Sequence, residues 1–294
     1  MALTAIQTEK WRQQIEAFLT TQTVASQVLD RAISMDGGDT FHVINPTDVT
    51  TAAVPAENTT DITYNLPTDT NVSVTKNFDN YFGLLILDTN KMQTTLAGWE
   101  RAYANNGAYQ LASDLDTAVF GDHANWTNFQ NSGADWQFES DAGATRLNQI
   151  TQLFSGLRQQ MRTNKVDNKG RPFLVVNEAL GALIEEFAAN RWTNFGDTTL
   201  MTSLAGGGRN FPFMGFDVFV SSNLTTVSTT LHCMAGIRGY GNALGVYSLP
   251  STFEVQRSEG RFGDIVRGRV AAGYKVLRTV AVYDVMVNTT MTGT

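Results

Sequence analysis

Charge is scarce in this chain of 294 residues. Only 17% of its residues are Asp, Glu, Lys or Arg, against about a quarter in an ordinary soluble domain. The 21 basic and 28 acidic residues leave a net charge of −7, and no lysine occurs between Lys10 and Lys76. A protein that binds a polyanion needs clustered Lys and Arg to displace counterions, so these totals argue against direct DNA binding. A surface this poor in charge indicates that much of it contacts other protein.

Cysteine and long apolar runs are also nearly missing. Cys233 is the single cysteine, so no disulfide forms within the chain, and we expect it to be a small buried residue in a strand. The first ten residues lack the basic-then-apolar order of a signal peptide. No run reaches the length of about 20 apolar residues that a membrane span needs. We therefore expect a soluble protein that no signal peptide exports and that has no membrane partner.

The residues that usually bind metals or nucleotides form no familiar pattern. His42, His123 and His232 show no paired spacing with one another or with clustered carboxylates. The glycines of 239–245 miss the dinucleotide-binding spacing by one residue, and the three glycines of 206–208 lack the Lys-Ser/Thr that a phosphate-binding loop requires. The sequence therefore predicts no cofactor-binding residue and no metal ligand.

Ser73 and Lys76 reproduce the spacing of a Ser-x-x-Lys nucleophile pair. They lie on a predicted strand, whereas enzymes with this motif place it on a helix, so that Lys returns to Ser one turn later. Chance is the better explanation, and we expect no catalytic residues and no enzyme. A soluble α+β hydrolase is nevertheless kept as a rival hypothesis. A small oligomeric mass and activity lost in Ser73→Ala would support it.

The longest element is a helix predicted between Asp88 and Gly121. Asp88 suits an N-cap and Gly121 suits a C-terminal stop, while Gly98 and Gly107 weaken the middle of the helix. At 1.5 Å per residue such a helix would measure about 50 Å, more than a compact domain of this size usually needs. Its apolar stripe consists of Leu96, Trp99, Tyr103, Ala108, Leu111, Leu115 and Ala118.

The second half of the chain mixes helices and strands, which predicts the α+β class. A strong apolar stripe predicts a helix over 143–164, and a short apolar run predicts a buried strand over 173–176. Asn177 is expected to cap the helix that follows. Further strands are predicted at 216–220, 231–237, 252–256 and 264–277, and alternating valines over 280–287 close the chain.

A polar extension precedes the long helix. Residues 41–44 predict a strand, and period-two spacing within 45–75 suits a two-stranded ribbon. The ribbon has too few apolar side chains to be stable alone, so packing on a neighbouring subunit is favoured over disorder. The residues expected to make this contact are Phe41, Val43, Val54, Ile62, Tyr64 and Leu66.

The leading segment, residues 3–35, predicts one or two short helices. Its apolar face is interrupted by the polar stretch 20–23, and it is too polar to fold as a domain. An arm that contacts a neighbouring subunit is the favoured interpretation, and a terminus packed on its own body is the alternative. The arm contacts would be Trp11, Ile15 and Phe18.

Two segments, together with the order of elements, resemble a known family. Segment 211–224 reads FPFMGFDVFVSSNL, and segment 258–278 reads SEGRFGDIVRGRVAAGYKVLR. The succession of arm, two-stranded loop, strand, long helix and helix–strand–helix unit is similar to that of the major capsid proteins of tailed bacteriophages, the Hong Kong 97-type shell fold. The resemblance covers nearly the whole chain in element order, and its specific parts are 156–188, 211–224 and 258–285.

The resemblance implies a domain layout. Residues 1–35 would be the N-terminal arm, 36–76 the extended loop across an adjacent subunit, and 77–142 the peripheral domain with the spine helix. Residues 143–255 would form the axial domain, and 256–294 would be strands that return to the peripheral domain. Loops at 192–209 and 239–249 would meet at the five- and six-fold capsomer centres, with Trp192, Asn194, Arg209, Tyr240 and Asn242.

The resemblance also implies a function. The chain would be a structural protein of the virion capsid that assembles in the host cytoplasm. Its pentamers and hexamers would form an icosahedral shell around viral double-stranded DNA, without sequence-specific binding. Implied partners are a portal, a decoration protein and a separate scaffolding protein, because nothing before Gly37 is long or charged enough to serve as a scaffolding segment. The nearest rival is an encapsulin-type nanocompartment, the same shell fold around protein cargo.

Some relatives of this fold join their subunits by a Lys–Asn bond whose lysine sits in the extended loop. This chain has no lysine from residue 11 to residue 75, so that loop cannot start such a bond. Mature shells boiled in detergent should therefore run as single-chain bands on a denaturing gel. A ladder of covalent multimers would contradict this expectation.

Overall fold

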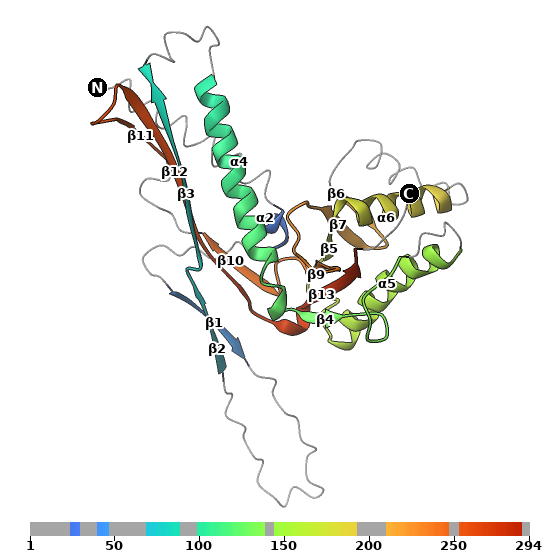
Figure 1. Cartoon of the computed structure of the whole chain (residues 1–294). Coiled ribbons are helices and arrows are strands. Elements are labelled where there is room, and N and C mark those ends of the chain that lie inside the picture. The colour runs from blue at the N-terminus through green and yellow to red at the C-terminus, as the bar shows by residue number, and fades with distance from the viewer. Residues whose placement is uncertain are drawn as a thin grey trace, which may run out of the picture.

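A long, narrow sheet runs beside a helix and meets a compact lobe at one end (Figure 1). This computed structural model describes residues 24–29, 40–46, 69–88, 99–138, 144–192, 210–246 and 253–289. The long sheet consists of β3 (Phe78–Leu87), β10 (Asn242–Val246), β11 (Phe253–Arg257) and β12 (Gly263–Val276). The compact lobe is a seven-stranded sheet with two helices against it. This mixture confirms the predicted α+β class.

Strand β12 is the centre of the long sheet. β3 pairs with it antiparallel along one edge, from Phe78 opposite Ala272 to Leu87 opposite Gly263. β10 and β11 pair with it along the other edge. Alternate residues of β3 are exposed, as period-two geometry requires when one sheet face is covered. The covering element is α4 (Trp99–Phe120), which runs along the sheet and buries Ala108 against Ile86 and Val266 (Figure 1).

One aromatic ring determines how closely α4 approaches the sheet. Phe82 of β3 lies between Gly107 of α4 and Gly268 of β12, its partner in the strand register. A Cβ atom added at Gly107 would stand 2.7 Å from the Phe82 ring, and one at Gly268 would stand 2.4 Å from it. Both glycines therefore make room for the ring. At Gly107 this close packing outweighs the cost of a glycine inside a helix.

The sheet of the compact lobe has the order β4–β13–β9–β5–β7–β6, and β8 pairs with β9. On one face, α5 (Ala144–Thr163) and α6 (Glu178–Trp192) bury the predicted apolar stripes. The Asn177 side chain accepts the Leu180 N–H at 2.9 Å, which confirms the predicted cap. The strands are β4 (Thr127–Phe129), β5 (Pro172–Val176), β6 (Asn210–Phe213), β7 (Phe216–Val220), β8 (Thr226–Val227), β9 (Thr230–Ile237) and β13 (Val282–Asn288).

The opposite face of this sheet packs on the C-terminal half of α4. Leu115, Val119 and Phe120 of α4 share one buried cluster with Phe173 and Val175 of β5. The alternate β5 residues, Leu174 and Val176, lie in the core under α5 and α6. β5 is thus buried on both faces, which explains its unbroken apolar sequence. Cys233 is buried in a strand, as predicted.

The compact lobe also explains the aromatic residues that follow the long helix. Trp126, Trp136 and Phe138 are all buried, and Phe129 stacks on Trp136 with 5.7 Å between ring centroids. For such rings, anchoring a loop to the core is the commoner outcome, and a docking surface is the alternative. They anchor the loop.

The strand pairing divides the chain differently from the implied domain layout. β13, expected to return to the peripheral domain, lies between β4 and β9 in the compact lobe. β10 and β11, expected within the axial domain, pair with β12 in the long sheet. Strand β4, placed with the peripheral domain, pairs with β13. Alternation along a segment predicts a strand, but it does not identify the strand that pairs with it.

Within the described ranges, three chain connections cross between the two parts, and they are bonded to one another. The Thr127 hydroxyl donates to the Thr279 carbonyl at 2.7 Å, joining the link after α4 to the link after β12. The N–H groups of Leu277 and Arg278 both donate to the Gly241 carbonyl, at 2.8 and 3.1 Å, and so include the link after β9. The connections therefore form one hydrogen-bonded junction.

The long helix differs in detail from its prediction. α4 ends at Phe120, directly before Gly121, but Gly121 does not adopt the left-handed backbone of a glycine stop. The Asp88 carboxylate accepts from both terminal nitrogens of Arg257, at 2.8 Å for Oδ1, so its side chain is engaged by the sheet. Residues 89–98 lie outside the described part, so the start of the helix is not placed. No helix in the described ranges is long and apolar enough to cross a bilayer.

The packing of Phe82 gives a test of how α4 is seated. Gly107→Ala should lower the free energy of unfolding by about 1–2 kcal/mol, because the overpacking cost exceeds the gain of about 1 kcal/mol in helix propensity. In a Phe82→Ala background the same change should instead stabilise, since the clash is gone. Chemical denaturation of the unassembled subunit measures both values.

The control for this test lies next to Gly107. Asn106 is exposed on α4, so Asn106→Ala should stabilise by about 0.5 kcal/mol in both backgrounds. A stabilising Gly107→Ala in the wild-type background would show that the ring does not limit the approach of the helix.

Candidate functional site

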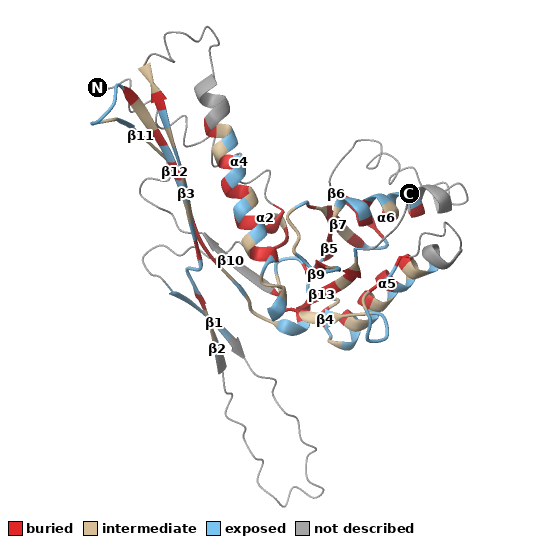
Figure 2. Cartoon of the chain, viewed as in Figure 1, coloured by how far each residue is buried: buried red, intermediate tan, exposed pale blue. Residues whose placement is uncertain are grey.

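The predicted ribbon is present and lies at the edge of the molecule. β1 (Thr40–Pro46) pairs antiparallel with β2 (Asp69–Thr75), and the pair extends away from the body (Figure 1). Much of the described ribbon is exposed to solvent (Figure 2). The Phe41 side chain is 37% exposed and the Ile44 side chain is 63% exposed. Val43 is half-buried. The other predicted ribbon contacts lie outside the described residues; they are Val54, Ile62, Tyr64 and Leu66.

The base of the ribbon is tied to the long sheet. The ammonium group of Lys275 in β12 donates a hydrogen bond to the Ser73 carbonyl at 3.1 Å. Lys76, just after β2, pairs with Asp79 at 3.0 Å. Ser73 lies on a strand, and the Lys76 ammonium is taken up by a carboxylate, so the geometry of a helical Ser-x-x-Lys nucleophile is not formed.

The face of the long sheet away from α4 carries a row of exposed ion pairs. Arg269 contacts Asp79 through two nitrogens, at 2.5 and 2.6 Å, and this guanidinium holds the pKa of the Asp79 carboxyl far below its ordinary value. Arg267 donates to Glu254 at 3.0 Å. Pairs this exposed contribute little stability each, but they fix the long side chains in an ordered row.

Large apolar side chains are exposed along the same sheet. Tyr81 of β3 is 78% exposed, and Phe262, in the turn before β12, is 86% exposed. Leu85 is also exposed on β3. Such residues, arranged beside ion pairs on an uncovered sheet face, are typical of surfaces that contact other protein.

The described part of the leading segment packs on its own chain. In α2 (Ala25–Val28), Ala25 and Val28 are buried against the cluster that contains Leu115. The Asp116 carboxylate of α4 accepts the Val24 and Ala25 N–H groups, each at 3.1 Å, and so caps the start of α2. For residues 24–29 the alternative of a terminus packed on its own body is therefore correct. Trp11, Ile15 and Phe18 lie outside the described residues.

The capping role of Asp116 could not be read from the sequence. Asp114 and Asp116 lie two residues apart on the predicted helix, and at that spacing two side chains point in different directions. Burial raises the pKa of the Asp116 carboxyl to about 6, against the opposing effect of the two N–H groups. Asp114 is exposed. The one sequence signal that could have identified this residue is an aspartate at a position on the apolar face of the helix.

The expected capsomer-centre loops are only partly as predicted. Within 239–246, the described part of segment 239–249, Asn242 opens β10 and pairs with Val276 in the long sheet. Tyr240 stacks under Arg278, with 4.3 Å from the guanidinium carbon to the ring centroid. Both residues therefore belong to the junction between the two parts. Trp192 ends α6, while Asn194 and Arg209 lie outside the described residues.

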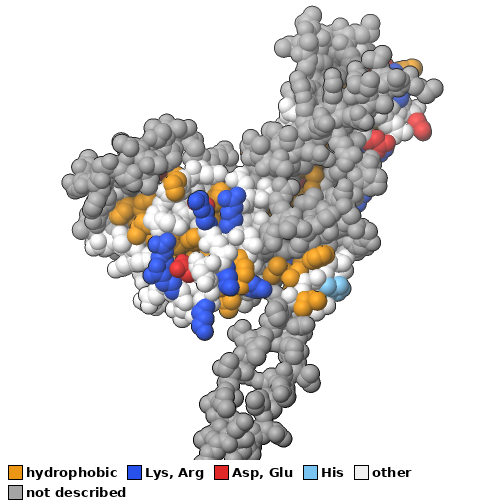
Figure 3. Space-filling view, turned by 180° about the vertical axis from the view of Figure 1, so that it is seen from behind, with side chains coloured by type: hydrophobic (Ala, Val, Ile, Leu, Met, Phe, Trp, Pro, Cys, Tyr) orange, Lys and Arg blue, Asp and Glu red, His pale blue; other side chains and the backbone are white. Residues whose placement is uncertain are grey.

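Basic side chains gather on one face of the compact lobe. Figure 3 shows Lys and Arg there with little acidic surface among them. Arg162, Lys165, Lys169 and Arg171 are exposed within a short span. The net charge of −7 is therefore unevenly distributed, and the argument from total charge does not apply to this end of the lobe.

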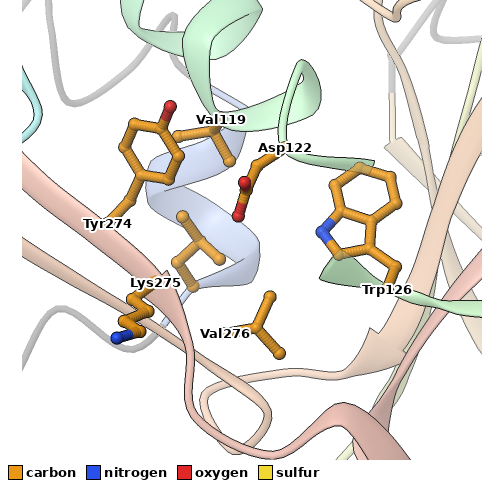
Figure 4. A pocket seen from close by; sticks show the side chains of 7 residues that line it. Val119, Asp122, Trp126, Tyr274, Lys275 and Val276 are labelled. Atoms are coloured by element: carbon orange, nitrogen blue, oxygen red, sulfur yellow. The ribbon is translucent and has the colours of Figure 1, made fainter. Parts of the chain in front are cut away.

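A small pocket lies where α2, α4 and β12 meet (Figure 4). Burial, with the nearby Asp122 charge, raises the pKa of the Tyr274 hydroxyl. Lys275 points away from the pocket, toward its bond with Ser73. The pocket lining contains no pairing of a nucleophile with a base. Its residues are Leu29, Val119, Asp122, Trp126, Tyr274, Lys275 and Val276.

The fold brings His123 and His232 together, although their spacing in the sequence gives no sign of it. His123 lies in the 3₁₀ turn η2 (His123–Asn125) and stacks on His232 of β9, with ring centroids 3.8 Å apart. His232 Nδ1 donates to Asp284 of β13 at 2.7 Å. Residues this far apart in sequence meet through strand pairing, which spacing alone does not reveal. His42 is exposed on β1.

The class of protein is defined by the whole arrangement. A projecting two-stranded ribbon, a long sheet with a spine helix, and a compact lobe with two helices are the parts of the Hong Kong 97-type capsid fold. The sequence matches no family model and no curated protein sequence. Comparison of structures, by contrast, finds 187 similar chains, and those with a probability of 1.00 include phage capsids.

Particular solved structures match nearly the full chain. A chain of Mycobacterium phage Che8 is 20% identical with a TM-score of 0.65, and the alignment covers 93% of both chains. The capsid of cyanophage P-SCSP1u is 14% identical with a TM-score of 0.62, covering 89% of this chain and 87% of the other. A virus-like particle from Pyrococcus furiosus is 12% identical with a TM-score of 0.55, covering 96% and 99%. The chain therefore has the Hong Kong 97-type capsid fold.

Asp116 predicts a pH dependence of stability. A folded-state pKa of about 6, against 3.8 ordinarily, means that the folded chain holds a proton that the unfolded chain releases. The stabilisation is complete below about pH 4 and is lost as pH rises through 6. At about 1.4 kcal/mol per unit it amounts to at most about 3 kcal/mol.

Asp116→Asn should remove this loss, and unfolding free energies measured at several pH values would show it as a difference from the wild type. Taking that difference also cancels other groups, such as His123, whose pKa is lowered by burial and which acts in the opposite direction. Asp114→Asn, two residues away and exposed, is the matched control and should keep the wild-type profile. Identical profiles for Asp116→Asn and the wild type would refute the assignment.

Proposed function

We propose that this chain is the major capsid protein of a tailed bacteriophage. Many copies would assemble as pentamers and hexamers into an icosahedral shell that encloses double-stranded DNA. The observation that carries this proposal is the match of fold over about nine-tenths of both chains to solved phage capsids. Fold alone does not specify function, so the surfaces of this chain supply the second support.

Those surfaces suit a subunit that is completed by its neighbours. A two-stranded ribbon is barely stable by itself in water, yet this one exposes Phe41 and Ile44. The uncovered face of the long sheet exposes Tyr81 beside its row of ion pairs. We propose that the ribbon of one subunit lies across an adjacent subunit, and that the segment before Val24 contacts a neighbour as an arm.

The remaining partners follow from the same proposal. In the infected cell the shell would incorporate a portal, any scaffolding protein would be a separate chain, and assembly would take place in the host cytoplasm. The loop between Trp192 and Asn210, with Asn194 and Arg209, would face the capsomer centre. Without a lysine in the extended loop, shell stability would rest on non-covalent contacts and on a decoration protein.

An encapsulin-type compartment is the second candidate. The match to a virus-like particle from Pyrococcus furiosus, which covers 99% of that chain, favours it. The two candidates differ in their contents. Shells purified from infected cells with nuclease-protected DNA and a portal would support the capsid, whereas a co-purifying protein cargo without DNA would support the compartment.

The ribbon is the part to test. Ile44→Asp places a charge on its exposed surface, where it should block packing on a neighbour without disturbing the subunit core. Electron microscopy of the expressed protein should show closed shells for the wild type and only small oligomers for the variant. Circular dichroism should be unchanged.

Val227→Asp is the matched control, because Val227 is 50% exposed on β8 in the compact lobe. This variant should still form shells. Normal shells from Ile44→Asp would overturn the role of the ribbon, and a well-behaved wild-type monomer at high concentration would overturn the proposed function.

A further inference from the structure

Two imidazoles and a carboxylate meet where the turn after α4 touches the compact sheet. His123, His232 and Asp284 each offer one ligand atom, and these atoms all lie within 4.8 Å of one another. They come from three separate elements: the turn η2, β9 and β13. His232 stands opposite Met286 and Asp284 opposite Met234 in the antiparallel register, so both side chains lie on one face of the sheet.

The carboxylate is incompletely satisfied. The Asp284 side chain is only 1% exposed, and its Oδ2 is bonded to His232 at 2.7 Å. Its Oδ1 is buried without a hydrogen-bond partner. A buried, unpaired carboxylate oxygen costs stability unless a donor or a cation meets it. One buried carboxylate oxygen of the cluster is therefore left without a donor.

We propose that His123, His232 and Asp284 form a binding site for a divalent transition cation of the Zn²⁺ type. Imidazole nitrogens suit Zn²⁺, Co²⁺ and Ni²⁺, whereas Mg²⁺ and Ca²⁺ prefer oxygen ligands only. Three protein ligands leave a further position for water. The cation would take the place of the hydrogen bond between His232 and Asp284, and neutral His232 would keep its proton on the ring nitrogen that does not bind the ion.

The surroundings favour a cation. Asp122 and Asp135 add negative charge near the two imidazoles and Asp284. Burial, reinforced by the neighbouring His232, lowers the pKa of His123, so this ring is neutral and able to bind metal at pH 7. The two rings are nearly parallel, with 13° between their planes. His123 is half-buried in a short turn, and its ring would turn out of the stack for the two nitrogens to converge on one ion.

Such an ion would fasten the turn after α4 to β9 and β13. It would therefore join the spine helix to the compact lobe at a point where the sheet itself supplies no backbone bond. This role is independent of shell assembly, so the metal site and the proposed capsid function can fail separately.

The experiment uses the full chain without a histidine tag, freed of metal by a chelator and desalted. Titration with Zn²⁺ against a coloured chelator should give one tightly bound ion per chain. Co²⁺ should produce the visible absorption bands of a nitrogen- and oxygen-ligated ion.

His123→Asn should weaken Zn²⁺ binding at least tenfold, while His42→Asn should bind as the wild type does, because His42 is exposed on the ribbon. Should His123→Asn misfold, the stoichiometry of Zn²⁺ binding and the Co²⁺ bands of the wild type decide the question. No bound ion in the wild type, or equal affinity in His123→Asn, would overturn the site.

Discussion

The helix α4 is the element on which both parts of the subunit depend. Its N-terminal half carries the small residues Gly107 and Ala108, which let it lie close against β3 and β12. Its C-terminal half carries Leu115, Val119 and Phe120, which reach into the core of the compact lobe. One helix with two kinds of side chain thus contributes to two cores. This is why the long sheet, which has only a small core of its own, holds its position relative to the lobe.

This arrangement leaves the opposite side of the long sheet to other contacts. The helix covers one face only, so the row of Arg–carboxylate pairs and the exposed Tyr81 stand on the other face, and Phe262 is exposed in the turn before β12. In the proposed shell these groups would meet a second copy. The polar row would fix the orientation of that contact, and the apolar side chains would supply its free energy.

Elements with a strong internal pattern were predictable from the sequence. The stripe of α5, the cap at Asn177 and the doubly buried β5 were all identified, since each depends on residues close together in the chain. Their partners were not. β13 and β10 joined different sheets from those expected, because pairing is decided by long-range topology.

The functional residues show the same division. The ribbon followed from alternation and from its shortage of apolar side chains, and its described strands confirm that prediction. The cap that Asp116 gives to α2 and the meeting of His123 with His232 join residues about 90 to 110 positions apart. No local pattern carries such information. The clearest signal in the sequence is Asp116, a charged residue at a position on the apolar face of a helix.

The hydrogen-bonded junction has a mechanical consequence. The described part of the chain crosses between the long sheet and the compact lobe three times, and Gly241, Leu277 and Thr279 bind these crossings together. A single tether would act as a swivel, whereas three bonded together resist twisting. Neither part is a continuous stretch of sequence, so neither can be cut away and expected to fold alone. A subunit built in this way transmits a force applied at its ribbon directly into its lobe.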